Sequence, residues 1–147
     1  MLTLTQIKPP NGDILVDLTL ALTAEERKRC RHRFTTLEGE IVYLHLPRGT
    51  VLQDGDLLQD YEETTLVRVS AKLEPVITVT TTNSKELLKA AYHLGNRHVP
   101  VEISTHYLRL APDPVLQKML EQLNFKVITE SQPFFPEQGA YKHHSDG

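Results

Sequence analysis

Residues 92–100 read Tyr92-His93-Leu94-Gly95-Asn96-Arg97-His98-Val99-Pro100 and contain two of the chain's seven histidines. Upstream of this stretch, apolar residues repeat with helical spacing behind Ser84, a residue type that caps helix N-termini well. The pair Gly95-Asn96 is typical of a helix that ends in the left-handed conformation. The sequence therefore predicts a helix over residues 84–94, and it leaves His98 outside that helix.

A strand is predicted directly after this helix, over residues 99–103. Apolar and polar residues alternate along it, so that His98 lies at its start, on the face that the apolar residues avoid. An imidazole in this position is accessible to a ligand outside the hydrophobic core.

The second half of the chain has the element order of a ferredoxin-like βαββαβ unit. The predicted elements are strand 76–80, helix 84–94, strand 99–103, strand 106–110, helix 113–123 and strand 125–129. Right-handed crossovers place both helices on one face of a four-stranded sheet and leave the other face bare. A second copy of the chain is the partner that we expect on that bare face.

The pairing of the two middle strands depends on the turn between them. If Ser104-Thr105 closes a two-residue hairpin, Ile103 lies opposite His106. The bare face then carries four side chains, those of His98, Glu102, Tyr107 and Arg109. Another register remains open, because Ser-Thr lacks the Gly or Asn that two-residue hairpins prefer, and a slip of one residue exchanges the two faces.

The predicted fold class is α+β. Short strands separated by turns rich in Gly, Asp and Pro predict a small all-β domain over residues 1–72. The ferredoxin-like domain occupies residues 73–132. Residues 133–147 are polar, rich in Pro and Gly at their start, and are expected to form a short disordered tail.

The composition of the chain excludes several classes of protein. Its hydrophobic content of 39% and charged content of 24% are ordinary for a globular protein, and no apolar run approaches the roughly 20 residues that cross a bilayer. A net charge of -3, with no basic half, does not favour nucleic-acid binding. The absence of a secretion signal and the single cysteine, Cys30, favour the cytoplasm. No catalytic motif is present, so we do not expect an enzyme.

Histidines are the residues most suited to binding a ligand in this sequence. Imidazole nitrogen binds nickel, copper and zinc well, but one imidazole makes a poor site, and the spacing of His93 and His98 does not match two ligands on one helix. On this chain alone, His98 is more often a surface or interface residue than a metal ligand. In a symmetric dimer each residue occurs twice, so two copies of His98 near the two-fold axis could bind one metal ion together. A metal role for His98 is then more plausible.

The C-terminal residues offer a second source of imidazole. His143 and His144 are adjacent in the polar tail, where they could be no more than solvated terminal residues. Their tether nevertheless keeps them at roughly millimolar concentration near a metal bound by the folded part of the chain.

Several motifs resemble those of the UreE family of urease accessory proteins, which are nickel metallochaperones. The resemblance covers nearly the whole chain, and the segments that carry it are His93-Leu94-Gly95-Asn96-Arg97-His98, Leu46-Pro47-Arg48-Gly49 with Asp54-Gly55-Asp56, Leu108-Arg109-Leu110 with Asp113 and Val115-Leu116, and Pro133-Phe134 with Pro136-Glu137 and Gly139-Ala140-Tyr141.

This resemblance implies a homodimer that carries Ni(II) as cargo to apo-urease, with the other accessory proteins, notably the GTPase UreG, as partners. It implies His98 of each copy as a metal ligand; we expect His143 and His144 to follow, with His93 as a lesser candidate. Many relatives have a histidine after the aspartate that matches Asp113, whereas this chain has Pro114. A ligand from the start of that helix is therefore not expected.

Two other classes of function remain open. One is a βαββαβ regulatory or RNA-binding module, although aromatic residues are not interleaved with basic ones on the predicted strands. The other is a protein-holding chaperone for which metal binding is incidental. Cu(II) or Zn(II) could also replace Ni(II), because imidazole sites bind copper more tightly than nickel.

Overall fold

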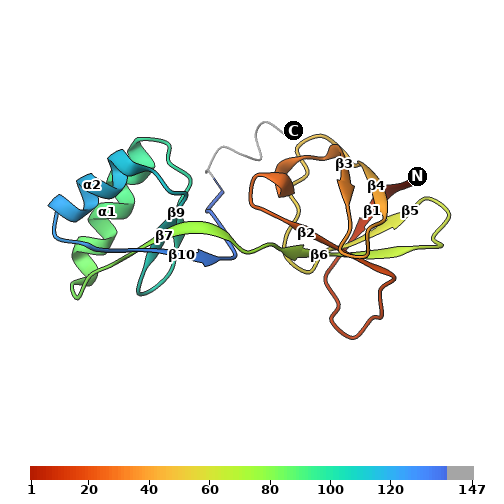
Figure 1. Ribbon diagram of the computed structural model, residues 1–147, viewed down its shortest axis with the longest axis horizontal. Coiled ribbons are helices and arrows are strands. Elements are labelled where there is room, and N and C mark those ends of the chain that lie inside the picture. The colour runs from red at the N-terminus through yellow and green to blue at the C-terminus, as the bar shows by residue number, and fades with distance from the viewer. Residues whose placement is uncertain (139–147) are drawn as a thin grey trace. The chain divides into compact units, whose positions relative to one another are not determined.

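The computed structural model describes residues 1–138 and shows a mixed α+β protein, which confirms the predicted composition (Figure 1). Within these residues the chain forms two compact units, the first over residues 1–72 and the second from Leu73 onward. Each unit has its own β-sheet, and both α-helices belong to the second unit. The tail histidines His143 and His144 lie outside the described residues. Within residues 1–138, no helix is both long and apolar enough to cross a membrane.

The first unit is a six-stranded sheet in the order β2-β6-β5-β1-β4-β3. Its elements are β1 (Leu2–Lys8), β2 (Leu18–Leu22), the short 3-10 helix η1 (Glu26–Lys28), β3 (Arg31–Thr35), β4 (Ile41–His45), β5 (Leu57–Asp60) and β6 (Leu66–Ala71). Strand alternation builds its core, because Val42 and Leu44 of β4 are fully buried while their neighbours Ile41 and His45 are exposed.

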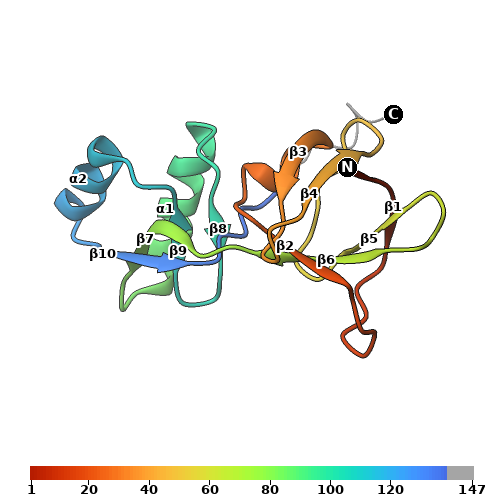
Figure 2. The same ribbon diagram turned by 45° about the vertical axis from the view of Figure 1, so that its right-hand side comes forward.

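The second unit is a four-stranded antiparallel sheet in the order β10-β7-β9-β8. Its elements are β7 (Glu74–Thr80), α1 (Ser84–Asn96), β8 (Glu102–Ile103), β9 (Leu108–Leu110), α2 (Pro114–Gln122) and β10 (Lys126–Gln132). They occur in the predicted order. Leucines of α1 and α2 share one buried cluster with Ile77, Val79, Leu108 and Leu110, so both helices cover the same face of the sheet (Figure 2).

Helix α1 begins and ends differently from the prediction. Asn83, not Ser84, is the N-cap, and its side chain accepts hydrogen bonds from Lys85 N at 2.9 Å and Glu86 N at 3.4 Å. The predicted stop at Gly95-Asn96 is also wrong, because both residues are helical and the left-handed residue is His98, with φ 58°.

The hairpin between β8 and β9 has a register shifted by two residues from the predicted one. Glu102 pairs with Arg109 and Ile103 with Leu108. A wider turn closes the hairpin, with Ser104 N donating to Tyr107 O at 3.0 Å. Because a shift of two preserves the faces, Glu102 and Arg109 still share the face opposite the helices. His98 does not join them, since β8 starts only at Glu102.

Candidate metal site

His98 caps the C-terminus of α1 in a left-handed backbone conformation. Its N–H donates to Gly95 O at 3.0 Å, and the N–H of Val99 donates to Leu94 O at 3.1 Å. This pair of hydrogen bonds is the Schellman motif, with His98 in the position that glycine usually occupies. Val99 packs in the cluster that contains buried Leu94, so a tertiary contact fixes where the chain turns.

The conformation of His98 is costly for any residue with a β-carbon. A left-handed backbone costs such a residue about 1–2 kcal/mol, a cost that glycine does not have. The side chain of His98 is exposed, so its imidazole does not repay this cost through burial in the described chain. Strained residues of this kind concentrate at functional sites. Glu63 and Asn124 share the left-handed conformation, and among these described residues His98 alone carries an imidazole, so we take it as the foremost candidate ligand.

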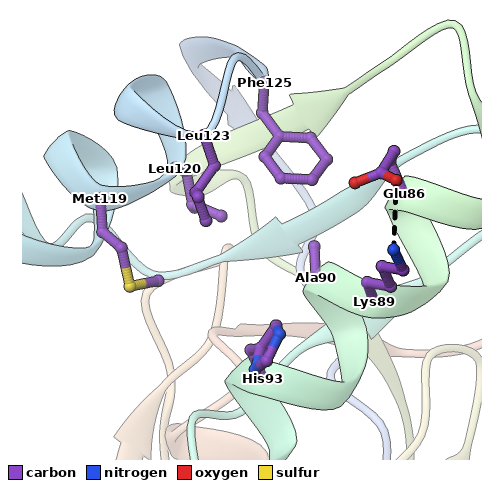
Figure 3. A pocket seen from close by; sticks show the side chains of 8 residues that line it. All are labelled: Glu86, Lys89, Ala90, His93, Met119, Leu120, Leu123 and Phe125. Atoms are coloured by element: carbon purple, nitrogen blue, oxygen red, sulfur yellow. Dashed lines mark hydrogen bonds and ion pairs between the residues drawn. The ribbon is translucent and has the colours of Figure 1, made fainter.

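His93 lies in a different environment from His98. It is exposed on α1, and its ring packs edge-on against Tyr92 with the centroids 5.6 Å apart. It also borders a small cavity of about 120 Å³ between α1 and α2, next to the ion pair of Lys89 and Glu86 at 3.5 Å (Figure 3). The other residues around this cavity are Ala90, Met119, Leu120, Leu123 and Phe125. The one carboxylate at this cavity, that of Glu86, is paired with Lys89, and the remaining lining residues apart from His93 itself are apolar.

The described part of a single chain does not assemble a metal site. Among residues 1–138, no group of three or more His, Cys, Asp or Glu side chains could hold an ion. Neither His98 nor His93 therefore belongs to such a group of three within residues 1–138.

An open, partly apolar surface includes Arg97, the residue that precedes His98 in the chain. It is lined by Arg97, Pro114, Val115, Lys118, Met119 and Gln122, which join the end of α1 to the start of α2. Val115 is 74% exposed. Pro114 occupies the first turn of α2 behind the N-cap Asp113, so α2 offers no imidazole at this position. The surface can pack against another protein without covering a charged ligand set.

The sheet face opposite the helices is covered by neither helix, as predicted, and it carries a row of polar side chains. Arg109 Nη1 donates to Glu102 Oε2 at 3.3 Å, Arg109 Nε donates to Thr78 Oγ1 at 3.1 Å, and Arg109 Nη2 lies 3.7 Å from Glu130 Oε2. Tyr107 stacks on the guanidinium at 4.2 Å. Each of the four strands contributes one residue to this row. Thr78 and Glu102 are buried, and each accepts a hydrogen bond from Arg109, so neither buried polar group lacks a partner.

This polar row predicts a specific acid dependence of stability. The hydrogen bond from Thr78, then that from Gln132 and the charge of Arg109, hold the pKa of Glu130 below its ordinary value of 4.5. Such a carboxyl stabilises the fold above its ordinary pKa, and the stabilisation is lost as pH falls through the lower folded-state value. We expect Glu130→Gln to lower the free energy of unfolding in urea at pH 7 and to lose this deficit in acid.

The control for this measurement is Glu121→Gln, which changes an exposed carboxylate of α2. Glu121 lies outside the polar row, so this variant shows the effect of removing a carboxylate that the row does not hold. A deficit of Glu130→Gln that is the same at pH 7 and pH 3 would contradict the assigned role of Glu130.

Comparison with known proteins gives matches over nearly the entire chain. The family model described as UreE urease accessory protein, N-terminal domain, matches residues 4–72, and that of the C-terminal domain matches residues 74–147. Proteins named urease accessory protein UreE are similar as well. The one from Nostoc punctiforme is 60% identical over 144 residues, covering 98% of this chain and 97% of the relative. The one from Thermosynechococcus vestitus is 53% identical over 144 residues, covering 98% and 100%.

Proposed function

Because the chain belongs to the UreE family of urease accessory proteins, and is thus an accessory chaperone of urease maturation and not an enzyme, we propose that it binds Ni(II) and delivers it to apo-urease. The family resemblance predicted from the motifs is confirmed by these matches. The observation that carries the nickel proposal is the exposed imidazole of His98 in a strained, left-handed cap.

The proposed metal site forms between two copies of the chain. A second copy that packs on the surface around Val115, about a two-fold axis beside His98, brings two imidazoles to one ion. The exposed apolar area of Val115 supports an interface here. The polar row on the helix-free sheet face argues against the earlier expectation of an interface on that face, because its polar groups already pair within the chain.

In this proposal the chain has two domains, and each contains one of the two β-sheets. Residues 1–72 form the β-rich domain, residues 73–132 form the domain for metal binding and dimerisation, and residues 133–147 form the tail. The expectation of a disordered tail is wrong for its start, because Phe134 is buried and Glu137 N donates to Val101 O at 2.8 Å. The strand order β10-β7-β9-β8 supports a ferredoxin-like fold for the second domain.

Two imidazoles leave nickel with open coordination positions. His143 and His144 of the tail are the proposed additional ligands, while His93 is a weaker candidate because it borders the mainly apolar cavity between the helices. Cu(II) and Zn(II) compete for the same donors. Weak, incomplete coordination suits a carrier that must release its cargo to urease together with the GTPase UreG. The free thiol of Cys30 fits a reducing compartment, and we place this exchange in the cytoplasm.

Calorimetric titration with nickel, combined with the mass of the nickel-loaded species in solution, tests the proposal. We expect one high-affinity ion for two chains, because each chain supplies one His98 to a shared site. Titration of His45→Ala, which changes an exposed histidine of β4, is the matched control. Its stoichiometry is expected to equal that of the wild type, and its affinity to stay within about two-fold. One tightly bound ion per monomeric chain would show that the site does not require a second copy.

A further inference from the structure

Three arginines lie on the outer face of the first unit, along strand β3. Arg31 and Arg33 are exposed residues of the strand itself. Arg29 precedes the strand, but its backbone is already extended, with φ -88° and ψ 102°. Cys30 and Phe34 pack in the core cluster of this unit, so strand alternation places the three arginines together on the opposite, outer face. Neighbouring members of such a row are about 6.6 Å apart along the strand.

The row of arginines adjoins a partly apolar surface on β4, the strand beside β3 (Figure 2). Arg33 lies opposite Tyr43, and directly opposed residues share a face. In the same way, Thr35 at the end of β3 lies opposite Ile41. Tyr43 is half-buried, whereas Ile41 is 47% exposed. We call this surface the arginine face, and its residues are Arg29, Arg31, Arg33, Ile41 and Tyr43.

The positive charge of the arginine face is not neutralised within residues 1–138. The ion pairs of this part of the chain are formed by Lys28, Lys89 and Arg109, and none is formed by the three arginines. Two carboxylates near them in the sequence have other contacts. Glu25 pairs with Lys28 at 3.4 Å, and Glu38 Oε1 accepts a backbone hydrogen bond at 3.0 Å. Because adjacent guanidinium groups repel one another, an anionic partner on this face is favourable.

An extended acidic segment of another protein has the chemistry and the spacing that this face requires. Carboxylates at alternate positions of an extended chain are also about 6.6 Å apart, so that each can meet one arginine. The planar guanidinium binds a carboxylate through two parallel hydrogen bonds, which adds geometric specificity to the attraction of the charges. An apolar side chain of the same segment can contact Tyr43 and Ile41.

Nucleic acid matches the arginine face less well than an acidic protein segment does. Single-stranded nucleic acid binds in a basic groove in which successive bases stack on aromatic side chains. The arginine face has one aromatic residue, Tyr43, and the net charge of the whole chain is -3, which opposes the binding of a long polyanion. A short acidic segment meets only the local positive charge.

We propose that the arginine face is a docking surface for an extended acidic segment of a partner protein, in which alternate carboxylates bind Arg29, Arg31 and Arg33. This role goes beyond the proposed nickel function and is independent of it, because it uses only the first unit and none of the candidate metal ligands. The contacts are electrostatic and exposed, so the affinity for the segment is expected to fall as the salt concentration rises.

The experiment is an NMR titration of the isotope-labelled, metal-free full chain with a short synthetic peptide in which glutamate and serine alternate. We expect saturable changes in the chemical shifts of the backbone amides of β3 and β4. The control peptide has glutamine in place of each glutamate, so it keeps the shape and loses the charge. It is expected to cause no saturable change in these amides.

Charge reversal on the protein completes the test. Arg31→Glu combined with Arg33→Glu is expected to weaken binding of the acidic peptide about ten-fold, because each reversal replaces an attraction by a repulsion. Arg33→Glu alone is expected to weaken binding about three-fold, and it decides the matter if the double variant does not fold. Lys126→Glu is the matched control, since it makes the same change of charge at an exposed residue of the second unit. Its affinity is expected to equal that of the wild type.

The other outcomes overturn the proposal. Equal binding of the acidic peptide by the wild type and by Arg33→Glu, or shift changes that lie outside β3 and β4, would show that the arginines do not form the surface. A single-stranded oligonucleotide that shifts the same amides and binds more tightly than the acidic peptide would assign the surface to nucleic acid. None of these results bears on nickel binding, so a failure here is distinguishable from a failure of the proposed nickel function.

Discussion

His98→Gly is expected to lose nickel binding and at the same time to make the metal-free protein more stable. Loss of a residue that merely supports a metal ligand costs 10–100-fold in affinity, so loss of the ligand from both copies is expected to cost at least about 100-fold. The gain in stability has a separate cause. Residue 98 has φ 58°, a conformation that strains a residue with a β-carbon but not glycine. The free energy of unfolding of His98→Gly is therefore expected to be about 1 kcal/mol higher than that of His98→Ala.

The comparison of the two variants separates backbone strain from metal ligation. Both lack the imidazole, so both are expected to lose nickel in calorimetry, while only the glycine variant relieves the left-handed backbone. Unfolding is measured in urea with a chelator present, because bound metal stabilises the native state by mass action. If His98→Gly binds nickel as tightly as the wild type, other residues must be the metal ligands. An alanine variant as stable as the glycine variant would mean that residue 98 is not strained.

The helices of the second unit could largely be predicted from the sequence, because their signals are local. Asp113 and Pro114 mark the start of α2, and the observed helix Pro114–Gln122 lies within the predicted 113–123. The end of α1 could not be predicted in the same way. Gly95-Asn96 is a strong local stop signal, but the packing of Val99 with Leu94 carries the helix past it and transfers the left-handed turn to His98.

The polar row could be predicted only in part. Alternation along two neighbouring strands was enough to group Glu102, Tyr107 and Arg109 on one face. Thr78 and Glu130 were missed, since they lie 31 residues before and 21 residues after Arg109, and only the strand order of the sheet brings them together. The helix-free face itself was predicted from the handedness of the two crossovers, and both helices do pack on the other face. The pairing of its polar side chains across all four strands cannot be inferred from periodicity.

The candidate site, too, could be predicted from the sequence only in part. The sequence indicates that His98 is accessible, and the structure agrees that it is exposed. Within residues 1–138, no group of three or more possible ligands could hold an ion, and the proposed site draws on a second copy and on the tail. The number of imidazoles on the metal therefore has to be obtained from a measurement that counts them.

The pH dependence of nickel affinity provides that count. Only neutral imidazole binds the metal, so in acid each ligating histidine must release one proton for the ion to bind. Two copies of His98 are therefore expected to give a limiting slope of two protons per ion in the logarithm of nickel affinity against pH, measured by calorimetry in a non-coordinating buffer. Glu130 does not contribute to this slope, because its pKa lies below its ordinary value.

The slope also separates the ligands of the dimer from those of the tail. A chain with His143→Ala and His144→Ala retains the two His98 imidazoles and is expected to show a slope of two protons per ion, whereas the wild type is steeper by one proton for each tail imidazole that coordinates. Affinity that stays constant from pH 8 to pH 5 would exclude imidazole ligation altogether. A slope of one in the tail variant would mean that only one His98 reaches the ion, and the two-fold site would then be wrong even if the protein is a dimer.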